Sequence, residues 1–512
     1  MRVRTTARLV GAAAVALLAG CASAGTSTPN GTVATGSSPD SSAAGSLAAY
    51  YDQKLHWTGC GAGYDCTKVT VPLDYAAPAG KTISLSMVRL KSTQAHGSLL
   101  LNPGGPGGSG VDLARHAYEE LTGDLVVAYD IVGFDPRGVG TSDPVDCLSD
   151  ADLDTFLAAD GTPRTPQQVA TITALSAGLG AGCAARSHDI AAHMGTADAA
   201  RDMDVIRAAL GDEKLNYLGF SYGTDLGAQY ADLFPSHVGR LVLDGAYPGS
   251  LTLEQGLAMQ SDSYDASLRR FVADCLTQSD CPLTGSLDGG VRRIQKFLSD
   301  LDTHPLPAAT NRLLTEGNAT PSIYYLLYAP TDGWPYLRTA LASAFAGDGT
   351  SLIASIDSVY GRQPDGSYSG NFFEAYYAVT CTDTPQLGGP QHVAALGAAW
   401  SRTAPVFGES QAWGTLPCWH WAPVRTNTAA PAVFHAKGSA PILVVATTHD
   451  PATPYAGGVE VAKELDNATL LTYDGDGHTA YHRGSTCIDA AVDAYLIHGT
   501  LPAPGTVCKP GS

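Results

Sequence analysis

The chain has 512 residues, of which 44% are hydrophobic, and its formal net charge at pH 7 is −19. This length exceeds one ordinary hydrophobic core, so we expect one large domain with an insertion, or two domains. No basic cluster occurs beyond the N-terminus, which argues against nucleic acid as a partner. Acidity of this kind mainly favours solubility and does not define a substrate.

The N-terminus has the pattern of an export signal. Three arginines within the first eight residues precede an apolar run at 9–19, which is too short to span a bilayer comfortably. The run ends in Leu-Ala-Gly-Cys at Cys21, which resembles a bacterial lipobox, where the cysteine is acylated. Cleavage by ordinary signal peptidase beside Ala-Ser-Ala, at 22–24, is the competing interpretation. We favour a signal peptide at 1–21, a flexible linker at 22–48, and an extracytoplasmic protein that is lipid-anchored at Cys21 or secreted.

Ten further cysteines predict disulfides, because an exported chain folds in an oxidising compartment. Sequence does not fix the pairing, and we take the pairing of neighbours along the chain as the working hypothesis: Cys60–Cys66, Cys147–Cys183, Cys275–Cys281, Cys381–Cys418 and Cys487–Cys508. Zinc is the alternative role for these residues. The chain has no Cys-x-x-Cys pair and no His-Glu-x-x-His run, so we expect neither a metal site nor a cofactor.

The first predicted strands lie at 86–90 and 98–101, and the second leads into a glycine-rich loop, NPGGPGGSG, at 102–110. This loop matches the G-x-G-x-x-G dinucleotide pattern, with Asp130 as the downstream acid. We favour a different role, in which the bare backbone N–H of Gly105 faces a developing oxyanion, because a serine motif further along explains the loop better.

The next strand is expected at 125–134 and is followed by the loop GFDPRGVGTSD. We interpret Arg137 in this loop as a charged tie that holds a tight turn, rather than as an anion site. A helical period follows at 198–210.

The central motif is Gly-Phe-Ser-Tyr-Gly at 219–223, between an apolar run at 215–218 and a helix-like run at 224–233. A serine flanked by small residues between a strand and a helix is typical of a nucleophile elbow, which lifts the hydroxyl of Ser221 clear of the sheet. The N–H of Tyr222 would be one oxyanion donor and that of Gly105 the other.

Strands alternate with helices up to a strand at 238–243, which predicts a mostly parallel sheet with helices on both faces. From 246 to 425 helical stretches dominate, and five of the six tryptophans lie there. We interpret this segment as a helical cap inserted between two core segments, 49–245 and 426–512. Its clearest helices are expected at 253–275, 291–301 and 334–345.

The strand pattern resumes at 442–446 and 468–473, and a helix is expected at 486–497. Loops after these two strands carry Asp450 and His478. Together with Ser221 they follow the chain order Ser, Asp, His of α/β-hydrolases. A serine hydroxyl needs a base to become a nucleophile, and the imidazole needs a carboxylate to hold its tautomer.

Other residues compete for these roles. Asp244, at the end of the strand after the elbow, is an alternative acid. Three other histidines are rivals for the base: His420, His449 and His482. Only His478 follows a late strand within a Gly-x-Gly-His turn. Asp383 is a candidate cap carboxylate for a substrate amine, with a solvated surface acid as the alternative.

Several motifs occur in one order, namely NPGGPGGSG, GFDPRGVGTSD, GFSYGT, Asp-Pro-x-Thr-Pro and GDGHT. Together they resemble the exported bacterial tripeptidyl aminopeptidases, in the prolyl aminopeptidase branch of the α/β-hydrolases, over residues 60–508. The resemblance implies an α/β-hydrolase fold with a TAP-like C-terminal region and a cap that recognises a free N-terminus. It also implies five site residues: Ser221, Asp450 and His478 as the triad, and Gly105 and Tyr222 as the oxyanion donors.

The chain departs from prolyl aminopeptidases proper at two points. They carry a histidine before the Gly-Gly-Pro-Gly turn, where this chain has Pro103, and an acidic Gly-Glu cap motif without a recognisable counterpart here. We therefore expect a serine peptidase that acts on peptides or proteins and releases short peptides from free N-termini. A carboxylesterase with the same triad and a non-catalytic, substrate-binding surface lipoprotein are the alternatives.

Overall fold

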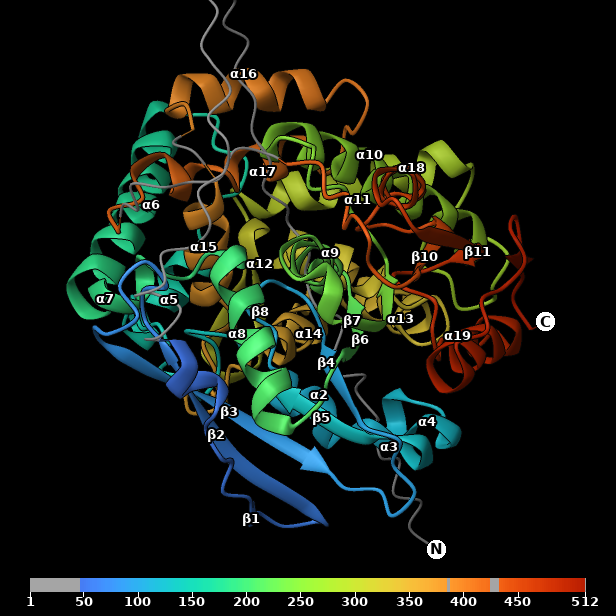
Figure 1. The fold of residues 1–512 in the computed structure, drawn as a ribbon. Helices are drawn as coiled ribbons and strands as arrows, with labels where there is room; N and C mark the ends of the chain where they lie inside the picture. The colour runs from blue at the N-terminus through green and yellow to red at the C-terminus, as the bar shows by residue number, and fades with distance from the viewer. Residues whose placement is uncertain (1–46, 385–386, 424–431, 512) are drawn as a thin grey trace, which may run out of the picture.

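A computed structural model describes residues 47–384, 387–423 and 432–511, and a ten-stranded sheet lies at its centre (Figure 1). The strands, in spatial order, are β1 (Thr58–Gly59), β2 (Tyr64–Pro72), β3 (Thr82–Leu90), β5 (Asp130–Phe134), β4 (Ser98–Asn102), β6 (Leu215–Phe220), β7 (Val238–Asp244), β10 (Ile442–His449), β11 (Ala468–Asp476) and β12 (Val507–Cys508). The pairs from β1 to β5 are antiparallel, and all pairs from β5 to β12 are parallel. This mostly parallel order confirms the predicted α/β-hydrolase fold.

Helices cover both faces of the sheet, as predicted. One face is packed by α8 (Thr196–Leu210), α9 (Tyr222–Leu233) and α18 (Tyr455–Glu464), and the other by α2 (Gly110–Arg115), α4 (Gly123–Ala128) and α19 (Thr486–His498). Side chains alternate along each strand, so β4 sends Leu100 into the first core and Leu99 and Leu101 into the second. Short helices complete the core: α3 (Ala117–Glu120), α7 (His188–Ala191) and η1 (Pro235–His237).

One predicted strand is partly wrong. The apolar run expected as a strand at 125–134 is divided into the helix α4 and the strand β5. Thr122 caps the helix by accepting a hydrogen bond from the N–H of Leu125 at 3.4 Å. An apolar run without a polar period does not distinguish a buried strand from a buried helix, and this cap decides in favour of the helix.

Arg137 is a buried tie, as interpreted from the sequence. Its guanidinium donates two hydrogen bonds to the carboxylate of Asp202, at 2.7 and 2.8 Å, and others to the carbonyls of Leu73 and His193 at 3.0 Å. The loop after β5 is therefore fixed to α8 and to the end of β2 by one side chain.

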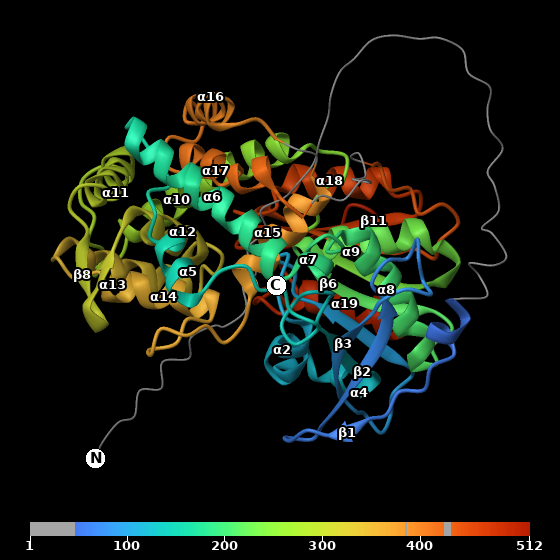
Figure 2. The same cartoon turned by 90° about the vertical axis from the view of Figure 1, so that its left-hand side faces the viewer.

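Between β7 and β10 the chain forms a layer of helices that stands beside the sheet (Figure 2). Its elements are α10 (Leu253–Cys275), α11 (Leu287–Leu301), β8 (Leu306–Ala308), η2 (Ala309–Asn311), β9 (Arg312–Leu314), α12 (Glu316–Leu326), α13 (Gly333–Phe345), α14 (Thr350–Tyr360), α15 (Phe372–Asp383), α16 (Pro390–Trp400), α17 (Gly408–Trp413) and η3 (Leu416–His420). The expected boundary of this segment at 425 lies outside the described residues. We call this layer the cap.

Two helices that precede the elbow, α5 (Asp150–Leu157) and α6 (Pro166–Arg186), pack into the cap as well (Figure 2). The ring of Phe156 lies 5.2 Å from that of Phe373, and a Cβ at Gly180 would stand 2.8 Å from the carbonyl oxygen of His420. By length and composition α6 is apolar enough to cross a membrane. The helix packs on η3 along one side, and 28% of its apolar window is buried within the protein.

Five disulfides join the described residues, and each pairs neighbouring cysteines as hypothesised: Cys60–Cys66, Cys147–Cys183, Cys275–Cys281, Cys381–Cys418 and Cys487–Cys508. Disulfides in this number are typical of chains that fold outside the reducing cytoplasm, so the protein is extracytoplasmic. The predicted signal peptide, Cys21 and the predicted linker up to residue 46 lie outside the described residues.

Candidate active site

Ser221 stands at the turn from β6 into α9, with φ 55° and ψ −125°, a backbone conformation that costs energy for any residue other than glycine. Its N–H donates to the carbonyl of Asp244 at 2.9 Å. A Cβ at Gly219 would stand 2.5 Å from the carbonyl oxygen of Gly223, and one at Gly223 would stand 2.8 Å from Oδ1 of Asn102. Both glycines that flank the serine are therefore required by close packing of the turn.

Asp450 and His478 follow the ends of β10 and β11, and the structure brings them together. Nδ1 of His478 lies 2.9 Å from Oδ1 and 3.0 Å from Oδ2 of Asp450. The same carboxylate accepts the N–H groups of Ala452 and Thr453 at 2.8 Å and of Thr479 at 3.1 Å. Both side chains are buried. This carboxylate is thus held as a fixed acceptor that orients the imidazole.

Asp244 has different partners. It accepts hydrogen bonds from the N–H groups of Ala480 and Tyr481, at 2.8 to 3.1 Å, and none from His478. Burial raises the pKa of Asp244 to about 6. It supports the segment that follows the histidine, while Asp450 contacts the imidazole itself. Among the rival bases, His449 directs Nδ1 to the carbonyl of Gly475 at 3.1 Å.

The atoms that acyl transfer would use are unoccupied by other hydrogen bonds. Oγ of Ser221 and Nε2 of His478 are both buried, and neither has a hydrogen-bond partner among the described residues. A Cβ at Gly245 would stand 3.4 Å from Cε1 of His478, and the neighbouring Asp244 carbonyl holds the N–H of Ser221. The backbone of Ser221 and the imidazole of His478 therefore both adjoin the segment at 244–245. Catalytic hydrogen bonds between a serine and its base often tighten only when substrate binds.

The glycine-rich loop abuts the elbow. Gly104, at φ 90°, leaves no room for a side chain, because a Cβ would stand 2.4 Å from the carbonyl oxygen of Phe220 and 2.9 Å from Cβ of Ser221. Within the described part of the chain, no acceptor binds the N–H of Gly105 or of Tyr222. The loop and the start of α9 thus bring two candidate oxyanion donors close to the serine, as the sequence predicts for acyl transfer.

The cap contacts the candidate base directly. The N–H of His478 donates to the carbonyl of Tyr328 at 2.9 Å, and the two rings lie 4.8 Å apart. A Cβ at Gly477 would stand 2.9 Å from Cδ of Pro330. The segment after α12 therefore packs on the turn that carries the histidine. No sequence motif marks Tyr328. The only signal in the sequence is that Tyr328 is one of many aromatic residues in the cap segment.

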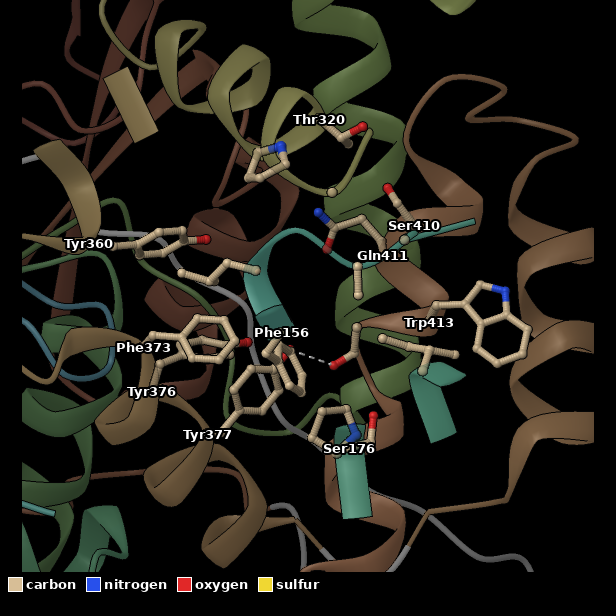
Figure 3. A pocket seen from close by; sticks show the side chains of 18 of the residues that line it. Phe156, Ser176, Thr320, Tyr360, Phe373, Tyr376, Tyr377, Ser410, Gln411 and Trp413 are labelled. Atoms are coloured by element: carbon tan, nitrogen blue, oxygen red, sulfur yellow. Dashed lines mark hydrogen bonds between the residues drawn. The ribbon is translucent and has the colours of Figure 1, made fainter. Parts of the chain in front are cut away.

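A cavity of about 140 Å³ lies in the cap, between α5 and α6 on one side and α12, α15 and α17 on the other (Figure 3). Eight aromatic residues line it: Phe156, Tyr324, Tyr360, Phe372, Phe373, Tyr376, Tyr377 and Trp413. The hydroxyl of Tyr377 donates to the carbonyl of Gly414 at 3.2 Å. Phe372 and Tyr376 also contact the glycine-rich loop, so this aromatic pocket adjoins the candidate oxyanion donors.

Asp383, the predicted amine-binding acid, ends α15 and accepts hydrogen bonds from both the N–H and the hydroxyl of Thr196, at 2.5 to 3.1 Å. The Thr196 hydroxyl in turn bonds the hydroxyl of Tyr222 at 2.6 Å. Asp225 lies one turn further along α9. Its own burial, followed by the negative charge of Asp383, raises the pKa of Asp225 to about 7. The structure therefore places two carboxylates near Tyr222, and the amine-binding role of Asp383 stays a prediction.

The C-terminal region, residues 404–508, matches a family model described as TAP-like protein, and this segment contains Asp450 and His478. Over 478 residues the chain is 36% identical to the serine protease Hip1 of Mycobacterium tuberculosis (strain ATCC 25618 / H37Rv), covering 89% of this chain and 91% of that protein. The chain belongs to the TAP-like serine hydrolases. This assignment confirms the resemblance that its motifs indicate.

Two further relatives of this TAP-like hydrolase have different names. It is 38% identical to carboxylesterase B of Mycobacterium tuberculosis (strain ATCC 25618 / H37Rv), covering 87% of this chain and 86% of that protein. It is 32% identical to the tripeptidyl aminopeptidase of Streptomyces lividans, covering 89% and 87%. Among solved structures, an α/β-hydrolase fold protein from Chitinophaga pinensis matches with a TM-score of 0.35 and 12% identity, over 88% of this chain and 99% of that one. At that TM-score the match adds nothing to the assignment.

Proposed function

We propose that this TAP-like hydrolase is an extracytoplasmic serine peptidase with Ser221 as nucleophile, His478 as general base and Asp450 as the acid that orients it. The observation that carries the proposal is the buried Asp450–His478 pair beside a strained serine turn, with Oγ of Ser221 and Nε2 of His478 both available. A constellation of this kind is recognised by geometry and roles.

In the proposed reaction, Oγ of Ser221 attacks the scissile carbonyl while Nε2 of His478 takes its proton. The carbonyl oxygen becomes an oxyanion and accepts hydrogen bonds from the N–H groups of Gly105 and Tyr222. His478 then gives the proton to the leaving amine as the C–N bond breaks. Water, activated by the same imidazole, hydrolyses the acyl-enzyme and regenerates the serine. Asp450 stabilises the imidazolium throughout and is not itself protonated.

We further propose that the substrates are peptides with a free N-terminus, from which short fragments are released. We assign residues 49–245 and 426–512 to the catalytic core and residues 246–425 to the cap, to which α5 and α6 also contribute. An aromatic pocket that adjoins the oxyanion loop supports binding of the acyl portion of a peptide. Asp383, with Asp225 nearby, is the proposed partner of the substrate ammonium.

The deciding experiment compares hydrolysis of a tripeptide anilide, its N-acetylated copy and a short-chain nitrophenyl ester. We expect the free tripeptide to be cleaved at least tenfold faster than the acetylated one, measured as kcat/KM, because acetylation removes the charge that a carboxylate would recognise. Asp383→Asn should reduce this ratio toward one while ester hydrolysis is kept. Asp365→Asn, at an exposed cap position, is the matched control. Equal cleavage of the free and blocked peptides would contradict the aminopeptidase proposal and indicate an endopeptidase.

A carboxylesterase is the second candidate, because a relative that bears this name is 38% identical over most of the chain, and because the pocket wall is largely apolar. Ester and amide hydrolysis use the same triad, so geometry separates them poorly. Ester turnover without any amide turnover in the experiment above would favour this candidate.

We also propose that Cys21 is acylated and tethers the enzyme to the outer face of the cell membrane. The lipobox-like run before Cys21 supports this proposal, and the oxidising location indicated by the five disulfides is compatible with it. Expressed in a bacterial host, the wild type should fractionate with membranes and Cys21→Ser with the soluble fraction. Equal release of both proteins would contradict the lipid anchor and favour secretion.

A further inference from the structure

Three carboxylates from distant parts of the chain meet behind the aromatic pocket. Asp160 lies between α5 and α6, Asp302 follows the last residue of α11, and Glu316 is the first residue of α12. One oxygen from each lies within 4.8 Å of the others. Glu316 also lines the aromatic pocket, so the cluster and the pocket share a wall.

Glu316 is buried, Asp160 and Asp302 are partly buried, and two of their oxygens lack a partner among the described residues. The side chain of Asp302 is only 8% exposed, and its Oδ1, like Oδ2 of Asp160, has no hydrogen-bond partner among the described residues. Asp302 pairs with Arg164, which is 58% exposed and whose Nε lies 4.0 Å from Oδ2 of Asp302. The same guanidinium is shared with a further carboxylate, Glu409, at 3.7 Å. Carboxylates buried without a partner are costly, and they are normally paired or coordinate a metal.

We propose that Asp160, Asp302 and Glu316 form a binding site for a hard divalent cation, with Ca²⁺ as the occupant. Ca²⁺ takes oxygen ligands in flexible geometry, which suits carboxylates contributed by three separate segments, whereas Mg²⁺ demands a near-ideal octahedron. The free oxygens of Asp160 and Asp302 supply the direct ligands. The oxygens of Glu316 also accept hydrogen bonds from the N–H of Gly161 at 2.8 Å and the hydroxyl of Thr320 at 2.7 Å, which orient this ligand.

A cation at this point would join the α5–α6 connection to α11 and α12. The loop between α5 and α6 is contributed by the chain before the elbow, and the other two ligands come from the inserted segment. The ion would therefore stabilise the aromatic pocket where the two segments meet. The sequence spacing of the ligands gives no metal motif, which is why no metal site was expected from the sequence.

The test measures thermal unfolding of the whole protein in EDTA and in about 1 mM Ca²⁺, a concentration at which extracellular calcium sites are occupied. We expect Ca²⁺ to raise Tm by about 2 °C, because an ion that binds only the folded state stabilises it. The rise should vanish in Asp302→Asn and Glu316→Gln. It should persist in Asp300→Asn, an exposed carboxylate two residues from Asp302 that pairs with Lys296.

A second readout covers the case in which a variant does not fold. Tb³⁺ bound at the wild-type site should emit when tyrosine and tryptophan are excited, because Tyr324 and Trp413 line the pocket that Glu316 borders, and excess Ca²⁺ should quench this emission by displacement. Without Ca²⁺, Asp302→Asn should be at least as stable as the wild type, because it removes a buried negative charge.

The proposal is overturned by an unchanged wild-type Tm in Ca²⁺ together with no sensitised Tb³⁺ emission, or by a calcium-dependent rise that Asp302→Asn retains. A third outcome also overturns it. If Ca²⁺ has no effect on Tm, but Asp302→Asn raises KM for a free tripeptide and not for its acetylated copy, the cluster binds the substrate ammonium.

Discussion

Replacement of Ser221 by alanine is expected to lower kcat by about 10⁴- to 10⁶-fold on every substrate that the enzyme turns over, with little change in KM. The hydroxyl is the nucleophile that attacks the scissile carbonyl in the proposed reaction, and binding of substrate in the pocket does not depend on it. The measurement is steady-state hydrolysis of the tripeptide anilide and the nitrophenyl ester, with labelling by a fluorophosphonate probe as an independent readout. Full activity in Ser221→Ala would contradict the nucleophile assignment and every step built on it.

The backbone of Ser221 supplies a control for this prediction. Its positive φ is costly for serine and alanine and not for glycine, so Ser221→Gly should be inactive yet at least as stable as Ser221→Ala. The relief of strain is worth about 1 kcal/mol and is offset in part by the greater unfolded-state entropy of glycine. Thermal unfolding of the two variants measures the difference. A clearly less stable glycine variant would show that the turn is not strained.

Asp450→Asn is expected to lower kcat by about 10⁴-fold, since an amide in place of the carboxylate favours the wrong tautomer of the histidine and no longer stabilises the imidazolium. The expected loss is in kcat more than in KM, because Asp450 contacts His478 and not the substrate.

Asp244→Asn is the matched control. Asp244 is equally buried, and its carboxylate accepts from the N–H groups of Ala480 and Tyr481, two and three residues after the histidine. We expect this variant to be less stable, by about 1 to 3 kcal/mol, because an amide cannot accept both bonds without leaving a donor unpaired. Its kcat should stay within about tenfold of the wild type. A 10⁴-fold loss in Asp244→Asn with near-normal activity in Asp450→Asn would reverse the assignment of the acid.

The sequence by itself predicts the features that depend on local pattern. A strand, a serine between glycines and a helix identify the elbow, because that turn needs small residues at both flanking positions whatever surrounds it. Ser221, Asp450 and His478 each follow an apolar run that forms a parallel strand, namely β6, β10 and β11, and their chain order is that of α/β-hydrolases. Neighbouring cysteines pair as hypothesised, since each is close in sequence to its partner.

Long-range contacts decide the rest. Asp244 and Val445 are register partners on the adjacent strands β7 and β10. The carboxylates of Asp244 and Asp450 therefore lie at the same edge of the sheet, and the sequence pattern distinguishes them only weakly as candidates for the catalytic acid. The turn after β10 folds Asp450 back onto His478, whereas the chain after His478 passes over Asp244. Such a choice depends on the path of two loops in space.

In the cap, even more of the contacts could not be predicted from the sequence. The packing of α5 and α6 against helices that lie far later in the chain, the contact of Tyr328 with His478, and the meeting of Asp160, Asp302 and Glu316 all join residues separated by more than a hundred positions, apart from the pair at 302 and 316. Periodicity reports which face of an element is buried and not which element covers it. The catalytic residues could therefore be predicted from the sequence, because each of them stands in a short local motif. The shape of the pocket and the ions or groups that its wall can bind were fixed only by tertiary packing.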